Sequence, residues 1–264
     1  MIVLEGAQAG YGGKPVLGGL DLTIDMDDRI ALIGNSLLDR LRHAGHIETL
    51  LHQRFPDHRL HVRNLSWSAD EITQQPRPAN FADLQQHLAH EKIDVIIAAY
   101  GFNESFQGRG GLAAFRSSLV TFLAGLKTRA FNGKTSPRIV LLSPIANENL
   151  DGVAAGEWNN ARIRLYLEVM RTVAAEQKIG FIDVFTATGE AMRSPGTDLT
   201  INGCHLSEAG YALLAATLYQ GLFDEAAPEF NESLRAAVID KNRQYFRRYR
   251  PLNTFYYTGN RNKS

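Results

Sequence analysis

The chain has 264 residues, of which 44% are hydrophobic and 21% are charged. This composition is typical of a protein that buries a core, and it excludes the compositions of disordered chains. Lysine plus arginine and aspartate plus glutamate both number 28, so the formal net charge is zero. No overall field would attract nucleic acid, and the length suits one large domain better than two enzyme domains.

Cysteine content and apolar segments limit the protein class further. Cys204 is the single cysteine, so no internal disulfide can form, and the sequence has no Cys/His spacing for a structural zinc. Residues 1–10 lack the basic start and apolar run of a signal peptide, and no stretch approaches the ~18 apolar residues of a membrane span. We expect no membrane span and, by default, a cytoplasmic protein.

Short apolar runs alternate with longer amphipathic stretches along the chain. The runs predicted to be strands are residues 29–33, 60–63, 95–98, 138–142 and 181–184. The stretches predicted to be helices are residues 38–55, 81–91, 112–130, 159–177, 207–223 and 229–249. This alternation predicts a three-layer α/β/α fold with a flavodoxin-like parallel sheet.

The same pattern divides the chain into three parts. Residues 28–225 are expected to form the α/β domain, and residues 226–264 a C-terminal helix with a basic and aromatic tail. Residues 1–27 are expected to form an N-terminal extension or edge strands.

Residues 2–33 resemble the strand-rich opening of an ABC-type ATPase. In that family the segment leads into a P-loop, G-x-x-x-x-G-K-S/T, whose amides and lysine hold phosphates. Here Gly34 is followed by NSLLDRLR, which has neither the second glycine nor the lysine. Nucleotide binding is therefore the least favoured function, and an ATP-dependent thermal shift would test it.

Two residues next to predicted helices have the chemistry of a nucleophile and a base. Ser36 follows the first predicted core strand, and His205 precedes a helix that Ser207 can cap. The carboxyl ends of parallel strands meet at one rim of a sheet, where ligands bind. This rim would also carry residues 64–70, 100–106 and 143–149.

An ordered set of motifs resembles the SGNH/GDSL family of serine hydrolases over roughly residues 28–222. The matching segments are GNS at residues 34–36, NLSWSAD at 64–70, YGFNE at 100–104 and NGCHL at 202–206. The resemblance implies the SGNH hydrolase fold, with Ser36 as nucleophile and His205 as general base. It also implies an oxyanion hole formed by Ser36, Ala69 and Asn103. Within the family, the motifs are most similar to a bacterial subgroup with GN-S/T in the first block.

Two positions depart from the family pattern. Asn202 stands where the family normally has the aspartate that orients the histidine, and Ala69 stands where it usually has a glycine. In a serine protease, asparagine in place of that aspartate lowers turnover by about 10⁴. Asp198 or Asp183 are alternative acids for orienting His205, with Asp198 preferred.

Other candidate sites carry weaker patterns. His43 and His46 lie three residues apart, but no third ligand joins them, so no metal site is expected. Cys204 next to His205 is a less favoured nucleophile than Ser36, since a small buried cysteine is the commoner role.

The expected function is a serine esterase or acylhydrolase that cleaves a carboxylic ester through an acyl-enzyme. Its expected partner is a small-molecule or carbohydrate ester, with an acetyl ester of a carbohydrate as one candidate, and no cofactor is needed. Because of Asn202 and Ala69, the alternative is a weakly active or inactive SGNH-like domain that binds a carbohydrate or ester.

Overall fold

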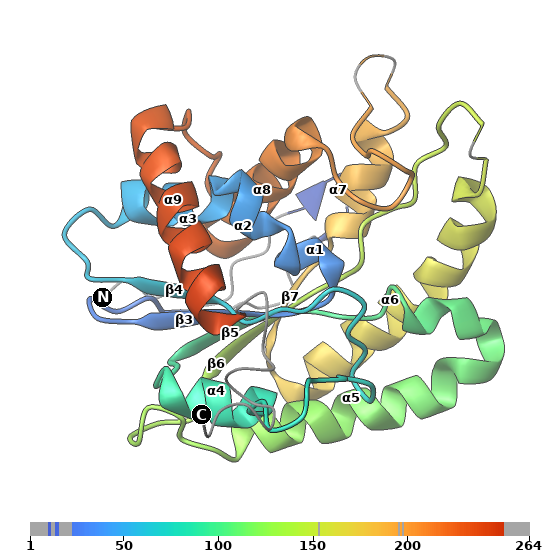
Figure 1. Ribbon diagram of the computed structural model, residues 1–264. Coiled ribbons are helices and arrows are strands. Elements are labelled where there is room, and N and C mark those ends of the chain that lie inside the picture. Colours follow the sequence, from blue (N-terminus) through green and yellow to red (C-terminus); the bar gives the residue numbers. More distant parts are fainter. Residues whose placement is uncertain are drawn as a thin grey trace.

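A five-stranded parallel sheet forms the centre of the molecule (Figure 1). The computed structural model describes residues 23–250 except 153, 195 and 197, together with the backbone of residues 10–11 and 14–15. The strands of the central sheet are β3 (Arg29–Gly34), β4 (His61–Asn64), β5 (Val95–Ala99), β6 (Arg138–Leu142) and β7 (Gly180–Ile182). Their order is β4-β3-β5-β6-β7, and every neighbouring pair is parallel, which confirms the predicted flavodoxin-like sheet.

Helices cover both faces of this sheet, so the fold has the three predicted layers (Figure 1). One face carries α1 (Ser36–Asp39), α2 (Leu41–Ala44), α3 (His46–Arg54) and α8 (Glu208–Phe223), with α9 (Glu232–Tyr249) packed outside α2 and α3. The other face carries α4 (Leu84–His90), α5 (Leu112–Lys127) and α6 (Gly156–Gln177). The 3₁₀ helix η1 (Glu104–Gly111) leads into α5, and α7 (Val184–Ala191) follows β7.

The core consists of two apolar layers separated by the sheet. Alternate residues of a strand point to opposite faces. In β3, Ile30 and Leu32 therefore pack under α3 and α8, whereas Ala31 and Ile33 pack against the α5 and α6 side. Strands β3, β5, β6 and β7 are buried on both faces, which explains why they read as continuous apolar runs in the sequence, whereas the edge strand β4 alternates half-buried and buried residues.

Several element boundaries differ from the predicted ones. The stretch 38–55 is three short helices rather than one, and Gly45 separates the last two with a left-handed φ of +70°. The strand predicted over 181–184 ends at Ile182, because the Asp183 side chain accepts a hydrogen bond from the Thr186 amide (2.9 Å) and begins α7. The sequence analysis predicted neither α7 nor η1.

The N-terminal segment is described only in part. Gly10–Tyr11 and Lys14–Pro15 pair as a separate antiparallel sheet. The other residues of 1–22, which carry most of the resemblance to an ABC-type ATPase, lie outside the described residues, as does the tail over 251–264. None of the helices in the described part of the chain has both the length and the apolar character needed to cross a bilayer.

Candidate active site

A cavity of about 220 Å³ lies at the rim formed by the carboxyl ends of the strands. The loops after β3, β4, β5 and β6 meet there, and the segment 199–206 closes the cavity from the side of α8. Ser36, Ala69, Asn103 and His205 all line this cavity. The structure therefore brings together the four residues that the sequence motifs predicted for nucleophile, oxyanion hole and base.

The turn from β3 into α1 places Ser36 at the cavity. Gly34 has φ +138°, and a Cβ there would lie 2.1 Å from the Ala99 carbonyl oxygen, so a side chain cannot be accommodated. Asn35 caps the helix: its Oδ1 accepts from the Leu37 amide (3.1 Å), and its own amide donates to Ala99 (3.3 Å). Ser36 follows as the first residue of α1.

Ala69 adopts a left-handed backbone, with φ +66°. This conformation costs a residue with a Cβ about 1–2 kcal/mol, which explains why a glycine suits the position. Alanine here keeps the same backbone, and its N–H, like that of Ser36, donates to no other residue in the described part of the chain. Both amides are therefore available to bind an oxyanion.

Asn103 supplies a third donor from the loop after β5. One N–H of its Nδ2 donates to the Asp70 carbonyl (3.3 Å), which leaves the second N–H of the same group. Next to it, the buried Glu104 carboxylate accepts from the amides of Gly101 (2.8 Å) and Ile72 (3.0 Å). Burial raises the pKa of Glu104. Glu104 thus ties the loop after β5 to the segment after β4.

His205 has Asn202 as its side-chain partner. Nδ1 of His205 lies 3.0 Å from Nδ2 and 3.1 Å from Oδ1 of Asn202, and Oδ1 also accepts from the His205 amide (3.0 Å). If the protonated Nδ1 donates a hydrogen bond to Oδ1, the lone pair stays on Nε2, where a general base needs it. If Nδ2 donates to Nδ1 instead, Nε2 carries the proton and cannot act as a base.

The pKa shifts in the cavity suit His205 as a base and disfavour the thiolate of Cys204. Burial lowers the pKa of His205, and the Arg40 guanidinium lowers it further, so the neutral imidazole is favoured. Burial raises the pKa of the Cys204 thiol, although its Sγ lies 3.4 Å from Nδ1 of His205. No hydrogen bond joins Ser36 to His205 within the described residues, and such bonds often form only with substrate bound.

The alternative acids are placed differently from Asn202. The Asp183 carboxylate accepts from Nη2 of Arg171 (2.6 Å) and caps α7. Asp198 is exposed, and its backbone carbonyl accepts from the Ser207 hydroxyl (3.0 Å). Neither carboxylate bonds to His205 in the part of the chain that the structure describes.

Glu148 lies in the segment 143–149 expected at the rim, but its own role was not predicted. Its buried carboxylate accepts from the Leu199 amide (3.0 Å) and from the amide (2.7 Å) and hydroxyl (2.6 Å) of Thr200. Its own amide donates to the Gly203 carbonyl (2.9 Å). Glu148 therefore holds the His205 loop against the loop after β6. In the sequence, Glu148 is an acidic residue in the polar stretch after β6, and the sequence does not show which of these polar side chains is buried.

His46 contacts a carboxylate and an aromatic ring. Its Nε2 lies 3.4 Å from a Glu208 carboxylate oxygen, and its ring packs edge-on against Phe230. Across residues 23–250, as far as they are described, no three metal-ligating side chains come together.

Comparison with known proteins adds a family and a fold. The model of the GDSL-like lipase/acylhydrolase family matches residues 32–213, and no curated protein matches the chain significantly. A catalytic mutant of Axe2, an acetylxylan esterase from Geobacillus stearothermophilus, is 17% identical with a TM-score of 0.62, and the match covers 79% of this chain and all of that one.

A gut microbial diltiazem-metabolizing enzyme is 18% identical with a TM-score of 0.58 over 76% of this chain. This chain spans about half of that enzyme, since the match covers 48% of its length. At these identities the structural likeness shows the fold alone. The family model covers more than half of the chain, so the protein belongs to the GDSL-like lipase/acylhydrolase family and has the SGNH hydrolase fold.

Proposed function

We propose that the protein is a serine esterase that cleaves a carboxylic ester through an acyl-enzyme on Ser36. The observation that carries this proposal is the shared cavity, which is lined by Ser36, Ala69, Asn103 and His205 from four separate segments of the chain. A nucleophile, a base and oxyanion donors around one cavity are the parts that acyl transfer requires.

The proposed reaction has two steps. Oγ of Ser36 attacks the ester carbonyl carbon while its proton passes to Nε2 of His205, and the negative oxygen is stabilised by the amides of Ser36 and Ala69 and by Nδ2 of Asn103. The carbon–oxygen bond to the alcohol then breaks, and His205 protonates the leaving alcohol. Water repeats the attack on the acyl group, releasing the acid and restoring Ser36.

Asn202 takes the position of the orienting acid in this proposal. Its Oδ1 can fix the productive tautomer of His205 by accepting from Nδ1, but it adds no negative charge to stabilise the imidazolium. Structures described as catalytic mutants of Axe2 replace a serine, an aspartate and a histidine, and that aspartate lies three residues before the histidine. The same spacing separates Asn202 from His205, which supports the assignment.

The size of the cavity favours a short acyl group. Pockets that hold drug-sized ligands are roughly 300–1,000 Å³, and this cavity is smaller, with Leu37, Phe102 and Ile145 on its walls. The similarity to acetylxylan and acetyl-xylooligosaccharide esterases supports the acetyl ester of a carbohydrate as the substrate.

Hydrolysis of p-nitrophenyl esters from acetate to octanoate tests the proposal. We expect turnover to be fastest with the shortest chains, and to fall by a factor of about 10³ or more in Ser36→Ala and His205→Ala. A Ser36→Ala variant as active as the wild type would contradict the assignment of the nucleophile.

The contact between Asn202 and His205 supports a second candidate, a binding domain with little or no turnover. Such a domain would bind an acetylated oligosaccharide saturably without releasing acetate, and the single change Asn202→Asp would give it turnover. Turnover by the wild type that depends on Ser36 would rule out this alternative.

A further inference from the structure

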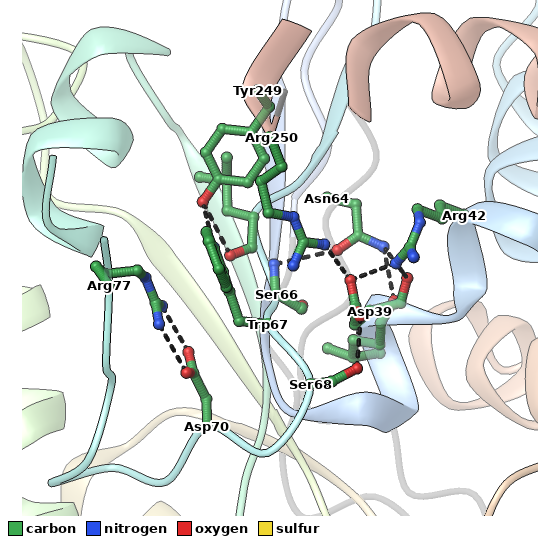
Figure 2. Close-up of polar contacts among 12 residues, drawn as sticks. Asp39, Arg42, Asn64, Ser66, Trp67, Ser68, Asp70, Arg77, Tyr249 and Arg250 are labelled. Atoms are coloured by element: carbon green, nitrogen blue, oxygen red, sulfur yellow. Dashed lines mark hydrogen bonds and ion pairs between the residues drawn. The ribbon is translucent and has the colours of Figure 1, made fainter. Parts of the chain in front are cut away.

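The loop after β4, residues 65–70, carries a strained residue between two anchored neighbours. Ala69 holds its left-handed backbone against the preference of its Cβ, so other contacts must fix this conformation. On one side, the Ser68 hydroxyl donates to Asp39 (2.7 Å). On the other side, the buried Asp70 carboxylate binds Arg77 in a bidentate pair (2.8 and 2.6 Å), as Figure 2 shows.

Asp39 connects this loop to the C-terminal helix. It lies in α1, three residues after Ser36, and its buried carboxylate accepts from Ser68, Arg42 and Arg250 (Figure 2). A buried carboxylate is stable only when cations and donors surround it, and removing one partner of a buried pair is costly. Arg250, which follows α9 as its C-cap residue, is therefore one of two arginines that hold the Asp39 carboxylate in place for Ser68.

Trp67 provides a second connection between Arg250 and the loop. The guanidinium carbons of Arg250 and Arg77 lie 4.5 and 4.4 Å from the centre of its ring, and Figure 2 shows the two arginines on either side of the indole. The Trp67 indole N–H donates to the Tyr249 hydroxyl (3.0 Å), and its amide donates to the Gly34 carbonyl (2.9 Å). Stacking of a guanidinium on an indole face is favourable.

Arg77 continues this chain of contacts into the cavity. It holds the carboxylate of Asp70, and the carbonyl of Asp70 accepts the hydrogen bond from Asn103 that orients this oxyanion donor. Contacts of Arg250 therefore lead to both sequence neighbours of Ala69, through Asp39 to Ser68 and through Trp67 and Arg77 to Asp70. The second path continues from Asp70 to Asn103.

We propose that Arg250 is a positioning residue for the oxyanion hole, acting through Asp39 and Trp67. The inference rests on the proposed function. Arg250 follows α9 and lies beyond residues 32–213, which the family model matches, so the family match does not include this support for the loop. The chemistry stays with the cavity residues, and Arg250 sets where the Ala69 amide and the Asn103 side chain lie.

Steady-state kinetics of Arg250→Ala on p-nitrophenyl acetate tests the proposal. We expect kcat to fall about tenfold with KM changed less than about twofold, because a displaced oxyanion donor weakens transition-state binding more than substrate binding. Arg250→Lys keeps a cation near Asp39 but loses the planar stacking on Trp67, so it should recover part of the lost kcat.

Two variants on the same helix control for stability. Arg247 is exposed, and Arg247→Ala should leave kcat unchanged. Val238 is buried about three turns earlier in α9, so Val238→Ala should lower the melting temperature without moving the loop. All kinetics are measured at a temperature at which circular dichroism shows every variant folded.

A boronic acid gives a readout of the oxyanion hole that does not depend on turnover. The boron of an alkylboronic acid bonds to Oγ of Ser36 and becomes tetrahedral, and the serine proton passes to His205. One boron-bound oxygen then occupies the oxyanion position. For Arg250→Ala, the inhibition constant should rise by about the same factor by which kcat/KM falls.

The outcomes separate the two claims. The positioning role is wrong if Arg250→Ala has the same kcat and the same boronate inhibition constant as Arg247→Ala. It is also wrong if Arg250→Ala loses no more kcat than Val238→Ala does. In both cases the esterase assignment stands. If the wild type shows no turnover that depends on Ser36, the proposed function fails and the positioning role fails with it.

Discussion

Asn202 and His205 form the contact on which the rate of the proposed reaction depends most. Both polar atoms of the Asn202 side chain lie within hydrogen-bonding distance of Nδ1, so the amide can stabilise either tautomer of His205. An aspartate at the same position could only accept, which would place the proton on Nδ1 and leave Nε2 free. Its negative charge would also stabilise the imidazolium that forms in the transition state.

Asn202→Asp should therefore raise kcat by about tenfold or more. In a serine protease, replacing the orienting aspartate by asparagine lowers kcat by ~10⁴. The added carboxylate should also raise the pKa of His205, so the acid limb of the pH–rate profile should move to higher pH. A profile of kcat/KM with p-nitrophenyl acetate for both proteins measures the two effects. Unchanged kcat and an unmoved limb would mean that Asn202 does not act on the base.

Arg40 should act on the same base in the opposite direction. His205 must be neutral to accept the serine proton, so activity is present above its pKa in the folded protein and is lost as the pH falls through that value. Burial first, and Arg40 second, lower this pKa below the usual 6.5. Arg40→Gln should therefore move the acid limb upward, toward 6.5, whereas Arg109→Gln at an exposed position should leave it in place.

Ala69→Gly tests the strain in the oxyanion loop. Glycine removes the cost of the left-handed backbone, which is about 1–2 kcal/mol for alanine. It also lowers the free energy of unfolding by roughly 0.4–1 kcal/mol, because the unfolded chain gains conformational entropy. We expect a net gain of between zero and about 1.6 kcal/mol in the free energy of unfolding, measured by urea denaturation. The matched change Ala114→Gly, at an exposed site inside α5, should instead lose about 1 kcal/mol. Equal losses in the two variants would argue against strain at Ala69.

At the scale of elements, the regular strands and long helices were the predictable part. Strands β3, β5, β6 and β7 are buried on both faces, so their apolar runs stand out from the sequence. The half-exposed edge strand β4 was predicted as well. The short helices were harder to predict. Gly45 divides the stretch 38–55 into separate helices, and the Asp183 cap begins α7 directly after β7. Such breaks depend on single turn residues and caps, which the period of hydrophobicity does not show.

The loop that carries His205 depends on a contact from another element. Glu148→Gln replaces one carboxylate oxygen by an N–H that cannot accept from the backbone of Leu199 or Thr200. We expect the free energy of unfolding to fall by about 1–3 kcal/mol, and kcat to fall because His205 shifts. Thermal unfolding and kinetics of this variant should be compared with exposed Glu157→Gln, which should behave as the wild type does. A Glu148→Gln variant with wild-type kcat would show that Glu148 does not position His205.

At the scale of the whole molecule, the parallel sheet explains which site residues the sequence could predict. Residues that directly follow β3 and β5 must lie at one rim, so Ser36 and Asn103 could be placed from their motifs and strand order. The supports of the site could not be predicted this way. Asp39 meets Arg250 and Glu148 meets Thr200 across folded segments far apart in the sequence, and nothing in the local pattern of either residue indicates its partner.

The most direct test of the central claim is mass spectrometry of the protein after reaction with an organophosphorus ester that labels activated serines. We predict one covalent adduct on the peptide that contains Ser36, no adduct in Ser36→Ala and much slower labelling in His205→Ala. Labelling of Ser36→Ala at the wild-type rate, or ester hydrolysis by a wild-type protein that is never labelled on Ser36, would contradict the account.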